Sequence, residues 1–194
     1  NERHSDPWYW SLVSRCYFEK KDYQKSFLYN EEASKVARDQ HEIFTVDFNR
    51  ATLLYLMDQP NEAMDILLKI SKDPIFGNIA KLQMTNILYQ YDQKNKALTV
   101  FNEIKINDDS VFKRDLMDHY EGLKLLFDKD NLDELSLYQR FLKLPNSFQK
   151  SFEGEWFSMY LNRRFNRPFK VEKAWKDIVR KYPEEAEKFG DWIP

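Results

Sequence analysis

A basic and aromatic segment, LNRRFNRPFK (residues 161–170), holds the residues of the sequence that are best suited to binding chemistry. Two phenylalanines interrupt its four cations, which are Arg163, Arg164, Arg167 and Lys170. Cations beside aromatic rings favour phosphate groups, acidic proteins or anionic lipids. The competing interpretation is a helix end with favourable cations, followed by a loop whose phenylalanines enter the core. We favour the second interpretation, because a helix end alone explains the first two arginines, and we keep the patch as a candidate site.

Motifs for catalysis or metal binding are absent from the sequence. The three histidines lack the HExxH spacing, one cysteine excludes common zinc ribbons, and there is no glycine-rich phosphate loop or GxSxG elbow. Glu153 and Glu155 precede Trp156, whose apolar ring suits glycosidic chemistry by raising a carboxyl pKa. Residues two apart on a helix do not face each other, so this pair is not expected to act as a unit. The sequence predicts no catalytic residue, no metal and no cofactor; a helical enzyme assembled from distant residues is the least favoured alternative.

Charge and hydropathy limit the class of protein. The 194 residues carry 30 basic against 32 acidic side chains, so the basic footprint of a nucleic-acid-binding protein is missing and no nucleic acid is expected as a partner. No apolar run approaches the roughly 20 residues of a transmembrane helix. The sequence begins with Asn1 rather than Met. We expect a soluble portion of a larger or membrane-tethered protein, and leave its compartment open.

Helical periodicity runs through almost the whole chain. Only four glycines are present, which argues against many tight hairpins. Polar turns divide the chain into five predicted helix pairs, at about 6–39, 42–71, 78–106, 111–144 and 147–182, and a C-terminal cap at 183–194. In the last pair, residues 147–163 are predicted to form one long helix. Because no linker is long enough to divide domains, we expect a single domain over 1–194.

One phrase of the sequence is written twice. DQPNEAMDIL (58–67) returns 34 residues later as DQKNKALTVF (92–101), which superimposes Ala63 on Ala97. Leu54 and Tyr55 fall on Leu88 and Tyr89 in the same frame, and an earlier copy with a longer spacer places Ser26 at the small position. A small side chain early in the second helix lets the two helices of a pair approach closely.

A helix–turn–helix unit of about 34 residues resembles the tetratricopeptide repeat (TPR) family. The first copy is the most similar, with aromatic and small residues at the expected places: Trp10, Tyr17, Asp22, Tyr23, Ser26 and Ala33. The turn glycine usual in the family is replaced by Lys21, Asp58 and Asp92. The resemblance covers residues 8–106 well and implies an all-α fold, a right-handed α-solenoid of about five antiparallel helix pairs. A non-repeating helical bundle is the alternative.

The resemblance further implies a non-enzymatic scaffold or adaptor, which binds a peptide or a partner protein on a concave surface lined by the first helix of each pair. The repeat frame places eight residues on that surface: Arg15, Asn49, Thr52, Tyr55, Gln83, Asn86, Tyr89 and Tyr120. The tyrosines at 55 and 89 either stack on a peptide or pack between helices, and both interpretations stay open. The alternative function is a peptide sensor that switches a partner, in which Arg15, Asn49 and Asn86 converge in a deep pocket.

Overall fold

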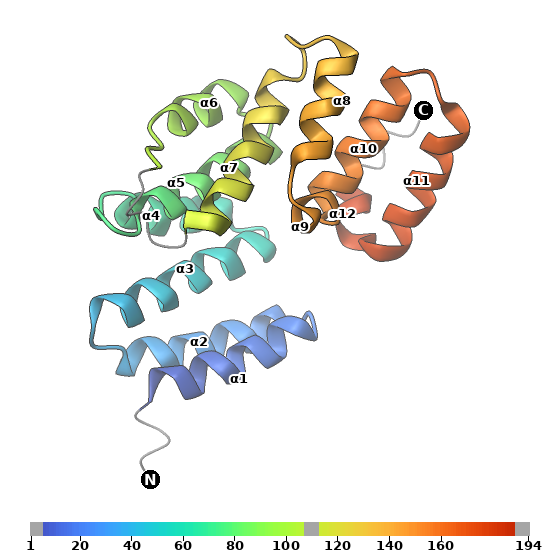
Figure 1. The fold of residues 1–194 in the computed structure, drawn as a ribbon. Helices are drawn as coiled ribbons and strands as arrows, with labels where there is room; N and C mark the ends of the chain where they lie inside the picture. Colours follow the sequence, from blue (N-terminus) through green and yellow to red (C-terminus); the bar gives the residue numbers. More distant parts are fainter. Residues whose placement is uncertain (1–5, 107–112, 189–194) are drawn as a thin grey trace. The chain divides into compact units, whose positions relative to one another are not determined.

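The computed structural model describes residues 6–106 and 113–188, and within these ranges every regular element is a helix. The chain divides into two compact units, unit 1 (Asn1–Lys113) and unit 2 (Arg114–Pro194), each of which is described here by itself (Figure 1). The predicted start of the fourth pair at 111 and the end of the predicted cap at 189–194 lie outside the described residues. The all-α fold is therefore confirmed, whereas a single continuous domain stays a prediction.

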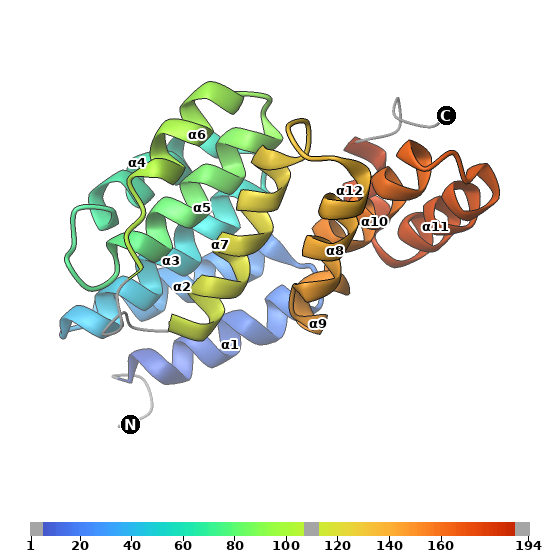
Figure 2. The same ribbon diagram turned by 45° about the horizontal axis from the view of Figure 1, so that its top comes forward.

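The described residues of unit 1 form six helices, and each helix packs against the next along the chain (Figure 2). Short turns join the helices of each pair, so the two run antiparallel. The helices are α1 (Pro7–Glu19), α2 (Tyr23–Val36), α3 (Gln40–Leu56), α4 (Pro60–Ile70), α5 (Gly77–Gln90) and α6 (Lys94–Asn102). This packing of adjacent pairs is consistent with a helical repeat. The right hand of the predicted solenoid stays a prediction.

Side chains before the first helices satisfy backbone groups that a helix leaves without a partner. The Asp6 carboxylate accepts the Trp8 N–H at 2.9 Å, and Pro7 occupies the first turn of α1, where a missing N–H costs nothing. Asp39 accepts the Glu42 N–H at 2.8 Å while the Glu42 carboxylate bonds back to the Asp39 N–H, which completes a capping box at the start of α3. These local signals explain why the helices begin where they do.

One turn geometry recurs in the three described helix pairs of unit 1 and between α10 (Phe152–Arg164) and α11 (Pro168–Lys181). A single residue after the first helix has a left-handed backbone in four turns: Lys21 (φ 58°), Asp58 (φ 60°), Asp92 (φ 55°) and Asn166 (φ 53°). In the third of these turns the residue-92 N–H donates to the Tyr89 carbonyl at 3.1 Å and the Gln93 N–H to the Leu88 carbonyl at 2.9 Å. The same two bonds recur in the other three turns, and they define a Schellman ending. Three of these residues replace the expected turn glycine; the fourth, in unit 2, has no counterpart in the predicted frame.

The small residues of the repeat frame lie at equivalent buried positions. Ala63 and Ala97 are completely buried, and Ser26 is nearly so. Each sits one turn into the second helix of its pair, where its N–H donates to the carbonyl of the residue before that helix. The predicted contact points of unit 1 are therefore confirmed. In the first pair the contact is polar, since Ser14 and Ser26 donate to each other's carbonyl oxygens at 2.8 and 2.9 Å.

Unit 2 contains α7 (Lys113–Asp128), α8 (Glu134–Lys143), α9 (Asn146–Gln149), α10 (Phe152–Arg164), α11 (Pro168–Lys181) and α12 (Pro183–Lys188). The single helix predicted over 147–163 is wrong, because the chain leaves helical geometry between α9 and α10. Ser151 adopts an extended backbone there, and its hydroxyl accepts the Gly154 N–H at 3.2 Å, which starts a new helix. The serine is a local helix-cap signal within a segment that apolar periodicity alone predicts to be one helix.

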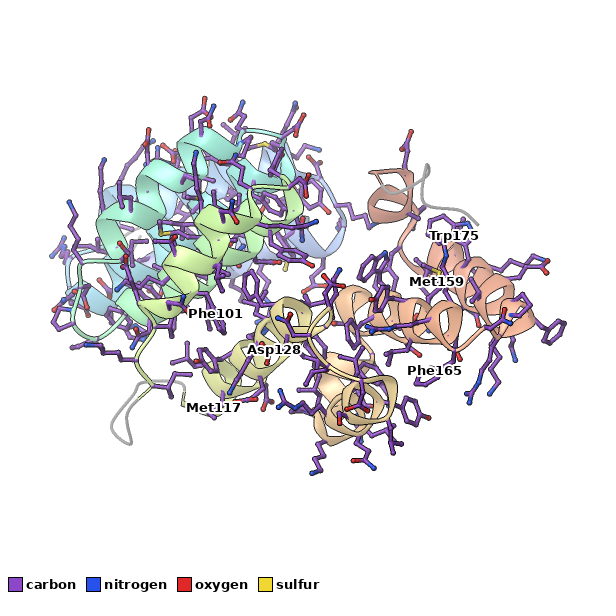
Figure 3. All side chains as sticks on the ribbon, turned by 90° about the horizontal axis from the view of Figure 1, so that it is seen from above. Phe101, Met117, Asp128, Met159, Phe165 and Trp175 are labelled. Atoms are coloured by element: carbon purple, nitrogen blue, oxygen red, sulfur yellow. The ribbon has the colours of Figure 1, made fainter. Side chains whose placement is uncertain are left out.

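Each unit has its own core. In unit 1 a cluster of buried side chains from α3, α4 and α5 is centred on Ala51, Leu67 and Ile87. In unit 2, Met159 of α10 lies against Trp175 of α11 (Figure 3), in a cluster completed by buried side chains of α11 and α12. These cores hold the helices that carry the candidate sites.

Candidate functional site

Six of the predicted binding residues lie on two neighbouring pairs of unit 1. Asn49, Thr52 and Tyr55 recur every three residues along α3, and Gln83, Asn86 and Tyr89 do so along α5, so each set shares one helix face. All six are half-buried. Together with Gln90 of α5 they are called the α3–α5 strip below. The strip carries no charged side chain.

Hydrogen bonds join the two halves of the α3–α5 strip. The Tyr55 hydroxyl donates to the Gln90 side-chain carbonyl, and the Gln90 amide nitrogen donates to Asn86 Oδ1 at 3.4 Å. The Tyr55 ring also packs against the core of unit 1. Tyr55 therefore connects α3 to α5. Of the two interpretations of this tyrosine, stacking on a peptide or packing between helices, the second describes its contacts. Gln90 is not among the predicted binding residues; the one signal for it is that a half-buried tyrosine hydroxyl needs a polar partner.

Two amides of the strip are left for a ligand. Within the described ranges, the side-chain amides of Asn49 and Gln83 make no hydrogen bond to the protein. Thr52 differs, since its hydroxyl donates to the Phe48 carbonyl of its own helix at 3.0 Å. A side-chain amide offers both donors and an acceptor, which is what the backbone of an extended peptide requires. The strip thus presents two unused bidentate groups on adjacent first helices.

The remaining predicted binding residues lie elsewhere. Arg15 is exposed on α1, and its guanidinium lies 3.7 Å from the Glu19 carboxylate of the same helix. Tyr120 is half-buried on α7 in unit 2, so its predicted place beside the strip stays a prediction. The convergence of Arg15, Asn49 and Asn86 in one deep pocket is likewise untested.

A second polar link joins the turns of successive pairs. The Tyr91 hydroxyl at the end of α5 donates to the carboxylate of Asp58, the left-handed turn residue between α3 and α4, at 2.8 Å. Burial, and then this bond to a carboxylate, raise the pKa of Tyr91. The Tyr91 ring meets the Tyr55 ring edge-on, with centroids 6.4 Å apart. The same aromatic pair therefore supports both the strip and the turn.

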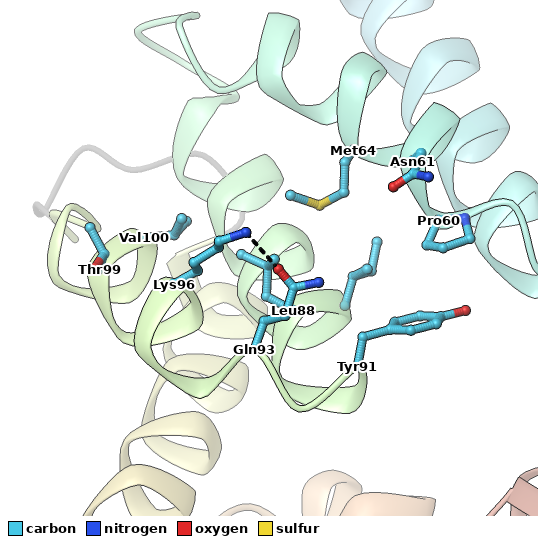
Figure 4. Close-up of a pocket in the computed structure, with 10 residues that line it drawn as sticks. Pro60, Asn61, Met64, Leu88, Tyr91, Gln93, Lys96, Thr99 and Val100 are labelled. Atoms are coloured by element: carbon cyan, nitrogen blue, oxygen red, sulfur yellow. Dashed lines mark hydrogen bonds between the residues drawn. The ribbon is translucent and has the colours of Figure 1, made fainter.

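The two copies of the repeated phrase line a pocket of about 550 Å³ (Figure 4). Pro60, Asn61 and Met64 of α4 form one side of it. The other residues come from the end of α5 and from α6 with its preceding turn: Ile87, Leu88, Tyr91, Gln93, Lys96, Thr99 and Val100. On this second side, Lys96 donates to the side chain of Gln93, which precedes the same helix, at 3.0 Å (Figure 4). The floor is apolar, so the pocket suits one apolar side chain.

The basic segment of unit 2 separates into structural and exposed residues. Arg164 donates to the Lys129 and Leu132 carbonyls at 2.6 and 3.3 Å, and so secures the α7–α8 connection. The Phe165 ring, half-buried, meets Tyr138 edge-on. Phe169, however, is 79% exposed, so the predicted docking of both phenylalanines into the core is wrong for this one. Residues 168–170 are the first turn of α11 rather than a loop, because Pro168 suits that position.

Across residues 6–106 and 113–188, no group of three or more His, Cys, Asp and Glu side chains is arranged to hold a metal ion. In that same part of the chain, no helix combines the length and the low polarity needed to cross a membrane.

Comparison with known proteins adds no family name to these sites. The sequence matches no protein-family model, no curated protein and no solved structure. Its likeness to TPR proteins therefore remains a resemblance in the repeat frame.

Proposed function

We propose that this protein is a non-enzymatic interaction scaffold, and that the α3–α5 strip binds an extended segment of a partner protein. The observation that carries the proposal is the pair of unused amides, Asn49 and Gln83, half-buried on adjacent first helices. Half-buried amides without a protein partner are satisfied by water or by a ligand. A peptide backbone supplies matching groups at every residue.

The surroundings of the amides support a peptide rather than a charged small ligand. No charged residue belongs to the strip, so a phosphate or carboxylate group finds no counterion there. The Tyr55–Gln90–Asn86 chain of hydrogen bonds holds the two helices together. Because Tyr55, Gln90 and Asn86 are already fixed, only the Asn49 and Gln83 side chains lose freedom when a peptide binds.

The test is a double substitution, Asn49→Ala with Gln83→Ala, in the full chain purified from its own cells with its partners. Partner recovery identifies the bound protein, and titration of a fragment of that protein then measures the affinity. Loss of two net hydrogen bonds is expected to weaken binding by roughly tenfold or more. A matched control, Gln24→Ala with Asn95→Ala, removes exposed amides from the second helices α2 and α6. Equal affinity of the two double variants for the fragment would refute the site.

Substitution of the tyrosines is a weaker test. Tyr55→Ala removes a ring that packs against the core of unit 1, so a loss of binding would also follow from loss of structure. Tyr55→Phe keeps the ring and removes only the hydroxyl that reaches Gln90. If the strip binds through its free amides, this variant retains most of the affinity.

A peptide sensor is the second candidate, and the pocket in Figure 4 is the observation that favours it. Its apolar floor and the Lys96–Gln93 pair on one side suit a short peptide that inserts one apolar side chain. Met64→Trp would fill the pocket without touching the strip. Short peptides that bind the wild type and fail to bind this variant would favour the sensor over the scaffold.

A further inference from the structure

We propose that the solvent-facing side of α11 is a docking surface for an anionic phospholipid bilayer. This surface, called the α11 ridge below, consists of Phe169, Lys170, Lys173, Lys176 and Arg180. Four of the five recur at i, i+4, i+7 and i+11, which places them on one line along the helix. All five are exposed.

The ridge faces away from the protein because the opposite side of α11 is anchored. Val171 and Ile178 are buried, at 3% and 0% exposure, and Trp175 packs in the same core cluster. Val171 and Ile178 lie roughly 160–180° around the helix from Phe169, and Trp175 about 120°. The ridge therefore meets a flat partner without any rearrangement of unit 2.

The charge of this region is opposite to that of the whole chain. Residues 163–181 carry eight Lys or Arg against two Asp or Glu, a net charge of +6 in a chain whose net charge is −2. Lys170 and Lys173 make no ion pair within the described part of the chain. Lys176 pairs with Glu172 at 2.7 Å and Arg180 with Asp177 at 3.1 Å, both within α11. Beside the ridge, Lys181 pairs with Glu155 of α10 at 2.5 Å.

An exposed ring favours a bilayer over other anionic partners. Phe169 is 79% exposed in the first turn of α11, and Pro168 beside it is also exposed. A bilayer removes such a ring from water, whereas cations alone bind any polyanion. Lysines next to an aromatic anchor are the usual composition of surfaces that bind acidic lipid headgroups. The combination thus distinguishes lipid from nucleic acid or an acidic protein.

A recess beside the ridge, where α10 meets the first turns of α11, has the size of a headgroup. It has a volume of about 460 Å³ and is lined by Arg163, Asn166, Arg167, Pro168, Val171, Glu172 and Trp175. The Arg167 guanidinium lies 5.4 Å from the centre of the Phe165 ring, which holds it at the rim. The one acidic member of the lining, Glu172, is neutralised by its pair with Lys176. Guanidinium groups at such a rim suit a lipid phosphate.

Co-sedimentation of the full chain with vesicles tests the proposal. We expect binding to phosphatidylcholine vesicles that contain roughly a third phosphatidylserine, and little binding to phosphatidylcholine alone. Lys170→Gln with Lys173→Gln should weaken the partition roughly 25-fold, at about fivefold per lysine. Phe169→Ala should weaken it by roughly tenfold through loss of ring insertion.

Matched substitutions in unit 1 provide the controls. Lys69→Gln with Lys72→Gln removes two exposed lysines, and Leu28→Ala removes a side chain that is 62% exposed; both should leave vesicle binding unchanged. Circular dichroism establishes that each variant is folded. Absence of binding to the acidic vesicles overturns the proposal. Equal vesicle binding by the wild type and Phe169→Ala also overturns it, because the ring would then contribute nothing. A nucleic-acid affinity that matches the vesicle affinity overturns it as well, because the ridge would then be a general polyanion site.

Discussion

The turn within the helix pairs of unit 1 recurs between α10 and α11 of unit 2, but the position after it is filled differently. In unit 1 a small residue follows each turn, and Ala63 and Ala97 are completely buried there. After the corresponding turn of unit 2 at Asn166, the equivalent residue is Val171, which is 3% exposed. A conserved turn geometry therefore does not dictate how closely two helices approach. The side chain one turn later sets the space between them.

Close approach in unit 2 occurs at glycines instead. A Cβ on Gly154 of α10 would lie 2.0 Å from the Phe148 carbonyl oxygen of α9, and a Cβ on Gly122 of α7 would lie 2.2 Å from the Phe148 ring. Both distances are shorter than any side chain tolerates. The paired helices of unit 1 thus pack through Ala or Ser, whereas unit 2 packs through glycines around one phenylalanine. Unit 1 also has a glycine at close approach, Gly77, where a Cβ would lie 2.6 Å from the Ser71 carbonyl oxygen at the start of α5.

The largest effect is expected for Gly154→Ala. The added Cβ meets backbone rather than a movable side chain, so α9 and α10 must separate. We expect a loss of about 3 kcal/mol in the free energy of unfolding, measured by urea denaturation. Ser158→Ala, about one turn further along α10, adds no atoms and is the control. A Gly154→Ala variant as stable as the control would show that glycine does not set the spacing in unit 2.

Reciprocal substitutions at the equivalent position sharpen the comparison. Ala97→Val should cost about 2 kcal/mol because the α5–α6 contact has no room for added methyl groups. Val171→Ala should cost about 1–2 kcal/mol for the opposite reason, a cavity between α10 and α11. Hydrogen exchange followed by mass spectrometry assigns each loss to its own unit. A neutral Ala97→Val would contradict the role of small residues in unit 1.

Turn residues should produce a smaller effect, with the sign reversed. Lys21 has a left-handed backbone, with φ 58°. A residue with a Cβ adopts this conformation at a cost of about 1 kcal/mol, although asparagine tolerates it well. Lys21→Gly is therefore expected to stabilise the protein by about 0.5 kcal/mol, after the added freedom of glycine in the unfolded chain is deducted. Asn166→Gly should be neutral or slightly destabilising. Thermal denaturation measures the stability of both variants. Destabilisation by Lys21→Gly would indicate that the lysine side chain stabilises the protein by more than its left-handed backbone destabilises it.

The smallest effect concerns the pH dependence of two helix caps. The Ser136 hydroxyl and then the Ser136 N–H donate to the Asp133 carboxylate at the start of α8 in unit 2, and these bonds lower the pKa of Asp133 below its usual value. The Lys25 side chain lowers the pKa of Asp22 at the start of α2 in unit 1 below the same value. A lowered pKa in the folded state means that the contribution is complete above the unfolded value and disappears as the pH falls through the folded one.

Melting temperatures between pH 6 and pH 2 test this dependence. We expect Asp133→Asn and Asp22→Asn each to lose less stability over the acid range than the wild type, because asparagine still caps a helix but does not titrate. An acid dependence as steep as that of the wild type in both variants would contradict the role of these carboxylates.

Much of unit 1 was predictable from local signals. A 34-residue frame and polar caps predict the helical class, the contact at Ala63 and Ala97, and the turns at Asp58 and Asp92. Each of these features depends on residues close in sequence. The break at Ser151 was not recognised, since apolar periodicity continues through it. The site was predictable as a set of helix faces but not as a set of bonds.

The sequence by itself determined that the chain is helical, where most helices begin and end, and which small residues lie between paired helices. Those features arise from interactions within one or two helical turns. Only the tertiary structure decided that Tyr55 is engaged by Gln90 while Asn49 and Gln83 are unused, and that Phe169 faces water rather than the core. These outcomes depend on which faces of distant segments meet, and no local pattern specifies the orientation of one helix against another.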